Sequence, residues 1–181
     1  MTGLRHGLAL AAAALALAVP APALGAQTPT QRFFSERLQA DDGTSREIRD
    51  LLRTRQGFVG RTVTFKDLTG DRRADAIVPV QSGGAAGAVA LYVFSTDTGE
   101  KGRGLRVVFR SQELRRAQTR VRDGVLRYRN ARPQPGDELC CPSRVAETRL
   151  RWRERLHKLT VAERSEAAPA DPWGDQAGSA R

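Results

Sequence analysis

Short apolar runs separated by glycine and aspartate fill the middle of this chain, and they limit the folds it can adopt. The runs are rich in β-branched and aromatic residues and too short for ordinary helices, which is typical of strands. Strands are expected at 63–65, 76–80, 88–94, 105–109, 119–122, 125–129, 146–152 and 156–162. Asp123-Gly124 separates two of them and favours a type I′ hairpin turn, because both central residues of that turn need positive φ. The series predicts an antiparallel sheet.

One helix is predicted ahead of the strands. Thr44 and Glu47 have the spacing of a capping box, in which a hydroxyl and a carboxylate satisfy the first N–H groups of a helix. Apolar residues then recur at helical spacing, at Ile48, Leu51 and Leu52. Gly57 is a suitable stop, so the helix is expected over 45–56 with one narrow apolar stripe. The predicted fold class is therefore α+β, a mainly antiparallel β-sheet domain with one N-terminal helix packed on it.

The first 26 residues have the order of regions found in a secretory signal peptide. Arg5 supplies a basic start, residues 8–19 are an unbroken run of Ala, Leu and Val, and small residues follow. Pro20 ends the run before the roughly 20 apolar residues that a membrane-spanning helix needs. Cleavage is expected after one of three small residues, Ala23, Gly25 or Ala26. No cysteine follows the run, so we expect no lipid anchor and a secreted, extracellular or cell-envelope product.

The rest of the chain predicts a single domain. Of the 181 residues, 155 follow the expected signal peptide, which is enough for one hydrophobic core. Residues 27–43 are polar apart from Phe33-Phe34 and are expected to form a linker. The α+β domain is expected over 44–163. Residues 164–181, rich in Pro, Gly, Ala and Asp, are expected to be a disordered tail.

The chain is strongly basic, and its positive charge is almost entirely arginine. The formal net charge is +10, of which Arg5 contributes one, so the mature chain carries +9. A planar guanidinium suits phosphate and carboxylate groups. A genome of high GC content also enriches arginine over lysine, so the ratio by itself identifies no ligand. The net charge nevertheless predicts attraction to anionic surfaces.

Arginines alternate with other residues on two of the expected strands. Because side chains on a strand alternate between its two faces, each set should lie on one face. The arginines are Arg127, Arg129, Arg149, Arg151, Arg153 and Arg155. If the two strands are neighbours, these side chains form a basic surface suited to an anionic envelope polymer or a protein partner. The alternative is a solvated outer face whose charges are screened by salt and nearby acids. Nucleic acid is not expected, because no aromatic residues interleave with the arginines to stack bases.

An aspartate-rich turn between two expected strands resembles a calcium-binding loop. Its candidate oxygen ligands are Asp67, Thr69, Asp71 and Asp75. Alternate positions are what a tight turn aims at one cation. Arg72 stands where the sharp-turn glycine is expected and Val78 where the bidentate Glu is expected, and the loop carries two arginines. An ordinary turn with aspartates accepting main-chain N–H bonds is therefore the favoured interpretation. Calcium is the weaker one, and no other cofactor is expected.

Cys140 and Cys141 are adjacent and are the chain's only cysteines. They form a strained vicinal disulfide, remain as two thiols that pack as small apolar residues, or link two molecules. An exported protein meets conditions in which disulfides persist. His157, the one histidine after the signal peptide, is expected on a strand away from them. No catalytic residue is predicted, and a thiol–disulfide enzyme is the least favoured function.

Several of these motifs occur together in one order. The turn 67–75 runs into the strand 76–80, a glycine-rich turn at 83–87 follows, and Cys140-Cys141-Pro142-Ser143 comes later. Over residues 65–161 this arrangement resembles the LppP/LprE-type family of exported actinobacterial envelope proteins. The resemblance implies an envelope location but no assigned activity. The family's lipid-attachment cysteine is missing here, so membrane anchoring is not implied. A structural or assembly factor without a ligand is the alternative to a binding protein.

Overall fold

The computed structural model describes residues 27–96, 104–138 and 141–169. The expected signal peptide, 1–26, lies outside the described residues. The helices are α1 (Pro29–Ala40), α2 (Arg46–Arg53) and the 3-10 helix η1 (Glu154–Leu156). The strands are β1 (Gly57–Val59), β2 (Thr64–Lys66), β3 (Asp75–Ser82), β4 (Ala88–Ser95), β5 (Arg106–Ser111), β6 (Gln118–Arg122), β7 (Val125–Arg132), β8 (Arg144–Arg153) and β9 (Lys158–Ala167).

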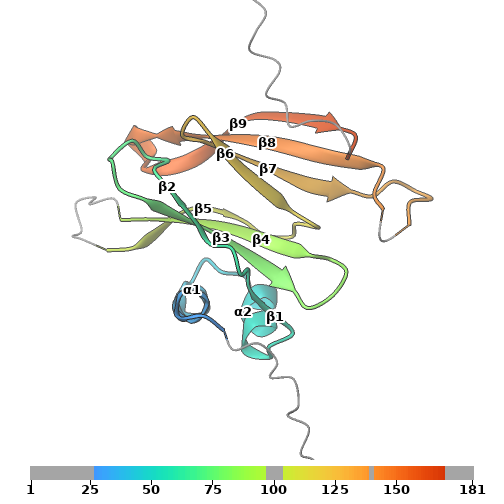
Figure 1. Cartoon of the computed structure of the whole chain (residues 1–181), viewed down its shortest axis with the longest axis horizontal. Coiled ribbons are helices and arrows are strands. Elements are labelled where there is room, and N and C mark those ends of the chain that lie inside the picture. The colour runs from blue at the N-terminus through green and yellow to red at the C-terminus, as the bar shows by residue number, and fades with distance from the viewer. Residues whose placement is uncertain (1–26, 97–103, 139–140, 170–181) are drawn as a thin grey trace, which may run out of the picture.

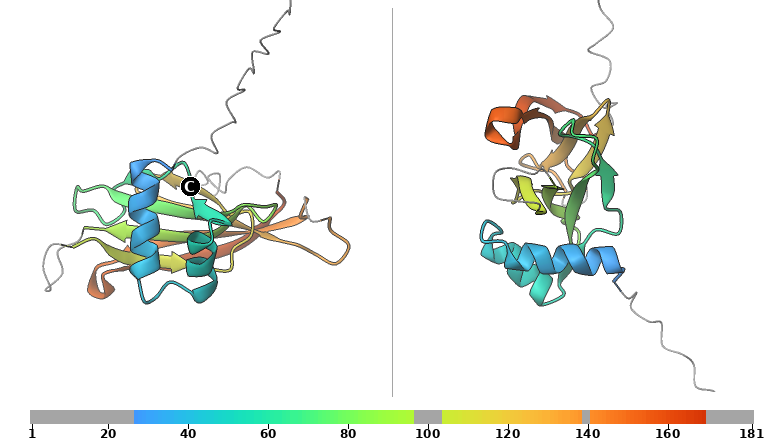
Figure 2. Two further views of the ribbon diagram at one scale, coloured as in Figure 1. Left: turned by 90° about the horizontal axis from the view of Figure 1, so that it is seen from below. Right: turned by 90° about the vertical axis from the view of Figure 1, so that its left-hand side faces the viewer.

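The molecule consists of three layers, namely helices, a first sheet and a second sheet (Figure 1). The first sheet has the order β1-β3-β4-β5, with β2 pairing the same edge of β3 as β1. The second sheet has the order β6-β7-β8-β9. Every strand pairing is antiparallel. The helices cover the face of the first sheet that points away from the second (Figure 2). The α+β expectation is confirmed, although two α-helices pack on the sheet rather than one.

Strands β3 and β4 are buried on both faces because they lie between the helices and the second sheet. Val78 and Tyr92 belong to the core that includes the helices. Their neighbours Ile77 and Leu91 belong to the core between the two sheets. All four side chains are at most 1% exposed. This double burial explains why these strands have nearly continuous apolar sequences instead of an alternating pattern.

The expectation that residues 27–43 form a linker is wrong, because they contain α1. Thr28 and Gln31 form a capping box: the Gln31 N–H donates to Thr28 Oγ1 (3.2 Å), and the Thr28 N–H donates to Gln31 Oε1 (2.9 Å). Phe34 and Leu38, one helical turn apart, are buried against the first sheet. The helix was hard to recognise because these two residues are its only buried apolar side chains.

The one predicted helix corresponds to α2, but its cap and length differ from expectation. Ser45, not Thr44, is the N-cap, and its Oγ accepts the Ile48 N–H (3.3 Å). The Thr44 hydroxyl is buried and instead donates to Asp41 Oδ2 (3.1 Å). The helix ends at Arg53, so it is shorter than the expected 45–56. Two adjacent hydroxyl residues made the choice of cap ambiguous from the chain alone.

Gly57 is the first residue of β1, a strand that the apolar pattern did not predict, and not the end of a helix. A Cβ at Gly57 would lie 2.5 Å from the Gln81 carbonyl oxygen, so the close strand contact requires glycine. Farther along, the Gly60 N–H donates to the Pro79 carbonyl (2.8 Å). In an antiparallel strand the N–H and C=O of one residue point to the same side. The N–H that Pro79 lacks therefore faces the gap between β1 and β2 and not β4.

The second sheet is a meander of four strands joined in chain order. Asp123 and Gly124 have φ values of 50° and 70°, which confirms the type I′ hairpin turn. Strands β8 and β9 are joined by η1 and by His157, whose φ is 47°. Strand β9 continues to Ala167, so the expectation of a disordered tail over 164–181 is wrong for 164–167, and residues 170–181 lie outside the described residues. Its last residues are ordered because they pair with the start of β8.

Candidate functional site

The predicted arginines gather on the outer face of the second sheet, the face that points away from the first sheet. Strands β7 and β8 are neighbours, as the prediction required, with Arg127 opposite Arg149. The next residues along these strands, Leu126 and Leu150, are buried between the sheets, so the arginines point outward. We define the arginine face as Arg120, Arg122, Arg127, Arg129, Arg149, Arg151 and Arg153. Arg155 lies in η1 and not on a strand, because β8 ends at Arg153.

Two of the predicted arginines form a buried ion cluster with Glu147. Arg129 Nε and Nη2 both lie 2.9 Å from Glu147 Oε2, and Arg127 Nη1 lies 3.6 Å from Oε1. The side chains of Arg129 and Glu147 are only 5% and 8% exposed. A carboxylate buried this deeply needs a charged partner with hydrogen bonds. The cluster of three groups still carries one net positive charge.

A row of like charges crosses three strands of the arginine face. Arg120 lies opposite Arg127, and Arg127 lies opposite Arg149, so three strands place three arginines side by side. On the far side of Arg149 is Glu163, with 3.8 Å between Arg149 Nη1 and Glu163 Oε2. Arg151 and Arg153 are exposed farther along β8. Like charges directly opposite each other destabilise a sheet by up to about 1 kcal/mol per pair.

Arg120 and Arg122 are members of the face that were not predicted from the sequence. Both lie on β6, where they alternate with Val121 and are exposed. The same alternation that identified the arginines of β8 is present here, but the run is short and contains only one bulky apolar residue. The role of Glu147 was also missed, since a lone glutamate on a strand is ordinarily solvent-exposed.

The aspartate-rich turn has the geometry of the turn interpretation. Asp67 Oδ1 accepts the Gly70 N–H (2.6 Å), and its Oδ2 accepts the Arg72 N–H (3.0 Å). Asp71 Oδ1 accepts the Arg73 N–H (2.8 Å). The carboxylates therefore hold the main chain of the turn. Among the described residues, no group of three or more His, Cys, Asp or Glu side chains is placed to hold a metal ion.

Asp75 is separated from the other candidate calcium ligands by its burial. It is 1% exposed at the start of β3, and its Oδ2 accepts the N–H groups of Leu68 (2.7 Å) and Thr69 (3.1 Å). Burial raises the pKa of Asp75 above its ordinary value, while hydrogen bonds from Ser95 and Leu68 oppose that shift. The carboxylate joins the turn to the sheet.

The aspartate-rich turn also meets the second sheet near one end of the arginine face. A hollow of about 370 Å³ lies between the turn and the hairpin of β6 and β7. Asp67 and Thr69 line it from the first sheet, and Arg151 and Trp152 line it from the second. The arginine face is therefore next to a polar hollow at this end.

The loop between β7 and β8 contains the cysteines and is organised by Asp137. Asp137 Oδ2 accepts the N–H groups of Gln134 (2.7 Å) and Ser143 (2.9 Å) and the Ser143 hydroxyl (3.1 Å). The bond from Gln134 is the largest cause that lowers the pKa of Asp137. Cys141 is disulfide-bonded. Cys140, the chain's other cysteine, lies outside the described residues, so the vicinal pairing stays a prediction.

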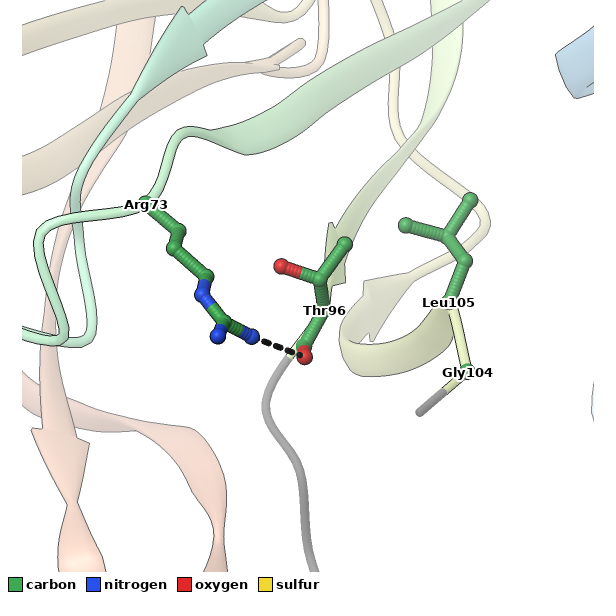
Figure 3. A pocket seen from close by; sticks show the side chains of 4 residues that line it. All are labelled: Arg73, Thr96, Gly104 and Leu105. Atoms are coloured by element: carbon green, nitrogen blue, oxygen red, sulfur yellow. Dashed lines mark hydrogen bonds between the residues drawn. The ribbon is translucent and has the colours of Figure 1, made fainter. Parts of the chain in front are cut away.

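A further open hollow of about 480 Å³ lies beside the end of β4. Arg73 reaches across it, and its Nη1 donates to the Thr96 carbonyl (3.5 Å), with Gly104 and Leu105 opposite (Figure 3). Residues 97–103, which connect the two sides, lie outside the described residues. The hollow therefore defines no site.

Comparison of the chain with family models, curated proteins and solved structures gives no match. None of the helices in the part of the chain that the structure describes is long and apolar enough to span a membrane. The arginine face is therefore interpreted from its own geometry.

Proposed function

We propose that this chain is an exported, non-catalytic protein of the cell envelope or extracellular space that binds an anionic envelope polymer through the arginine face. The observation that carries the proposal is the cross-strand row Arg120, Arg127 and Arg149. A sheet face with no ligand gains stability from pairing opposite charges, whereas this row places like charges together. An anionic polymer lying across the strands would add negative charge to the row, beyond the contacts of Arg127 with Glu147 and of Arg149 with Glu163.

The geometry of the face suits an extended ligand better than a compact one. Arginines on β6, β7 and β8 continue along β8 to Arg151 and Arg153, and the second sheet forms the outermost layer opposite the helices (Figure 1). A guanidinium binds phosphate or carboxylate through two parallel N–H donors. A chain of phosphate or uronate groups would present such acceptors repeatedly. The predicted signal peptide and the resemblance to envelope proteins support the location.

Charge reversal on β8 tests the proposal. We expect Arg149→Glu with Arg151→Glu to weaken strongly the binding of the mature protein to long-chain polyphosphate, followed by fluorescence anisotropy at several salt concentrations. Each phosphate contact contributes about 0.7 to the slope of log affinity against log salt for a flexible polyanion. Loss of two contacts should therefore lower the slope by about 1.4, and the two new carboxylates should repel what remains.

A matched control distinguishes loss of contacts at the arginine face from a general effect of lower net charge. Arg32→Glu with Arg46→Glu makes the same charge change at exposed positions on the helices, on the opposite side of the molecule. Arg46→Glu removes the contact of Arg46 with Asp50, but both side chains are exposed and such a pair contributes at most about 1 kcal/mol, so this variant should fold. It should keep most of the binding. Equal loss in both variants, or unchanged binding in the β8 variant, would refute the proposal.

The alternative of a structural or assembly factor makes a different prediction in the same assay. If the loop that contains Cys141 serves only to shape the protein and no ligand binds, wild type would show no salt-dependent affinity for polyphosphate. A serine variant of both cysteines would then lose stability and no binding. Wild-type binding that the serine variant retains would favour the arginine face.

A further inference from the structure

A separate pocket of about 260 Å³ lies at the other end of the outer face of the second sheet from the aspartate-rich turn. Arg129, Ala131 and Val145 of β7 and β8 lie in it, and all three are less than 9% exposed. Arg116 and Gln118, at the start of β6, line it as well. Ala131 is paired with Val145, two residues along β7 from Arg129, so the pocket continues directly from the arginine face.

Arg116 is held at the pocket by an unusual backbone conformation. Its φ is 50°, in the left-handed region that residues other than glycine rarely adopt. The Arg116 N–H donates to the Ala86 carbonyl (2.7 Å), which fixes this conformation. Gly87 packs beside it, and a Cβ at Gly87 would lie 3.2 Å from the Arg116 Cα. An arginine in this conformation costs stability that glycine or asparagine would not.

The charges around the pocket favour an anion. Arg116 and Arg129 line it, and among the lining residues that the structure describes none is an aspartate or a glutamate. Glu147 binds Arg129 from the neighbouring strand, and with Arg127 this cluster keeps one net positive charge. The Arg116 side chain adds a second charge. Apolar walls around a charged group lower the local dielectric constant and strengthen its interaction with a ligand of opposite charge.

We propose that this pocket binds a single phosphate monoester group. Its volume of about 260 Å³ is below the range of roughly 300–1,000 Å³ typical of pockets for drug-sized ligands. It has room for one phosphate with a small substituent. The Arg116 guanidinium would supply two parallel N–H donors, and the Gln118 amide would supply another donor. The net positive charge of the Arg127–Glu147–Arg129 cluster would attract the phosphate. This site goes beyond the polymer-binding proposal and does not depend on it.

Methyl phosphate tests the pocket, with calorimetric titration of the mature, disulfide-intact protein at low salt. We expect saturable binding to wild type and an affinity at least about tenfold weaker for Arg116→Gln, since a charged hydrogen bond contributes about 1.5–3 kcal/mol. Arg116→Lys should retain part of the affinity, because it keeps the charge and loses the two parallel N–H donors. Lysine and glutamine face the same backbone cost as arginine at this position.

Arg115→Gln is the matched control, because it removes the same charge from the adjacent exposed residue, which does not line the pocket. It should bind methyl phosphate as wild type does. Arg149→Gln with Arg151→Gln should also retain methyl phosphate binding, whatever happens to polyphosphate. Equal loss in the Arg115 and Arg116 variants, no saturable wild-type binding, or equally tight binding of acetate would overturn the assignment. Should Arg116→Gln unfold, the Arg116→Lys and Arg115→Gln proteins still decide the question.

Discussion

At the scale of single residues, Asp75 shows how one buried carboxylate joins a turn to a sheet. Its two hydrogen bonds hold the main chain at Leu68 and Thr69, so the turn enters β3 with a fixed geometry. Burial excludes water from these hydrogen bonds. It also disfavours the ionised form of the Asp75 carboxyl group. Asp75 was one of four candidate calcium ligands in the chain, and its burial could not be inferred because aspartates in turns are ordinarily exposed.

The raised pKa of Asp75 predicts a pH dependence of stability. Because the folded-state pKa lies above the ordinary value of 3.8, this group's contribution is fully present below pH 3.8 and is lost as pH rises through the folded-state pKa. Asp75→Asn keeps an acceptor oxygen and has no such titration. Urea unfolding of both proteins from acidic to neutral pH measures the difference. The variant should gain stability relative to wild type as pH rises, and parallel curves would contradict this.

At the scale of elements, the pair of β7 and β8 is held together by a charge cluster as well as by its backbone. Glu147 lies against Arg127 and Arg129, both of β7, and all three side chains are mostly buried. Such a cluster fixes the register of the two strands, because a shift by one residue would turn the charges toward the core. The register in turn sets the row of arginines.

Removing the charge of Glu147 alone should lower the free energy of unfolding much more than removing the charges of Glu147 and Arg129 together. Glu147→Gln leaves two guanidinium groups together in a buried place and should cost about 3–5 kcal/mol of unfolding free energy. Adding Arg129→Met removes one uncompensated charge and should recover a large part of that loss. Denaturant unfolding of the two single variants and the double variant gives the coupling. Additive losses would show that the cluster does not act as a unit.

The loop between β7 and β8 carries the prediction of a vicinal disulfide between Cys140 and Cys141. The expected result is a monomer whose intact mass is two hydrogens below that of the reduced chain, and which takes no alkyl group under denaturing conditions until reduced. The same mass also fixes the signal-cleavage site. Two alkyl groups on the unreduced protein would show free thiols, and a doubled mass would show a bond between molecules.

Elements differed in how far the chain predicted them. The hairpin at Asp123-Gly124 was predicted well, because its turn conformation depends on two adjacent residues. Helix α1 was missed because its buried stripe is so narrow. Residues 164–167 were not recognised as part of a strand because the end of β9 is polar and is ordered by pairing with β8. The hairpin turn was specified by its own two residues. Helix α1 and the end of β9 depend on the elements that they pack against or pair with.

At the scale of the whole molecule, the layered architecture could not be inferred from the chain. The runs 76–80 and 88–94 showed that two strands are deeply buried, but a continuous apolar run does not say what covers each face. One face is covered by helices and the other by a second sheet. Strands β7 and β8 are neighbours, which was the condition for the predicted basic surface, but the burial of Glu147 and the pocket beside Arg116 depend on tertiary contacts.

The two sheets occupy separate stretches of the chain, with the first ending at Ser111 and the second beginning at Gln118. A polypeptide that emerges N-terminus first can therefore complete the helices and the first sheet before the second sheet exists. During that interval Ile77, Leu91 and Val93 face water without their cover. Exposed apolar surface of this kind is where partly folded chains associate. A chain that emerges in this order therefore passes through one stage at which it is most prone to association, and formation of the C-terminal meander ends that stage.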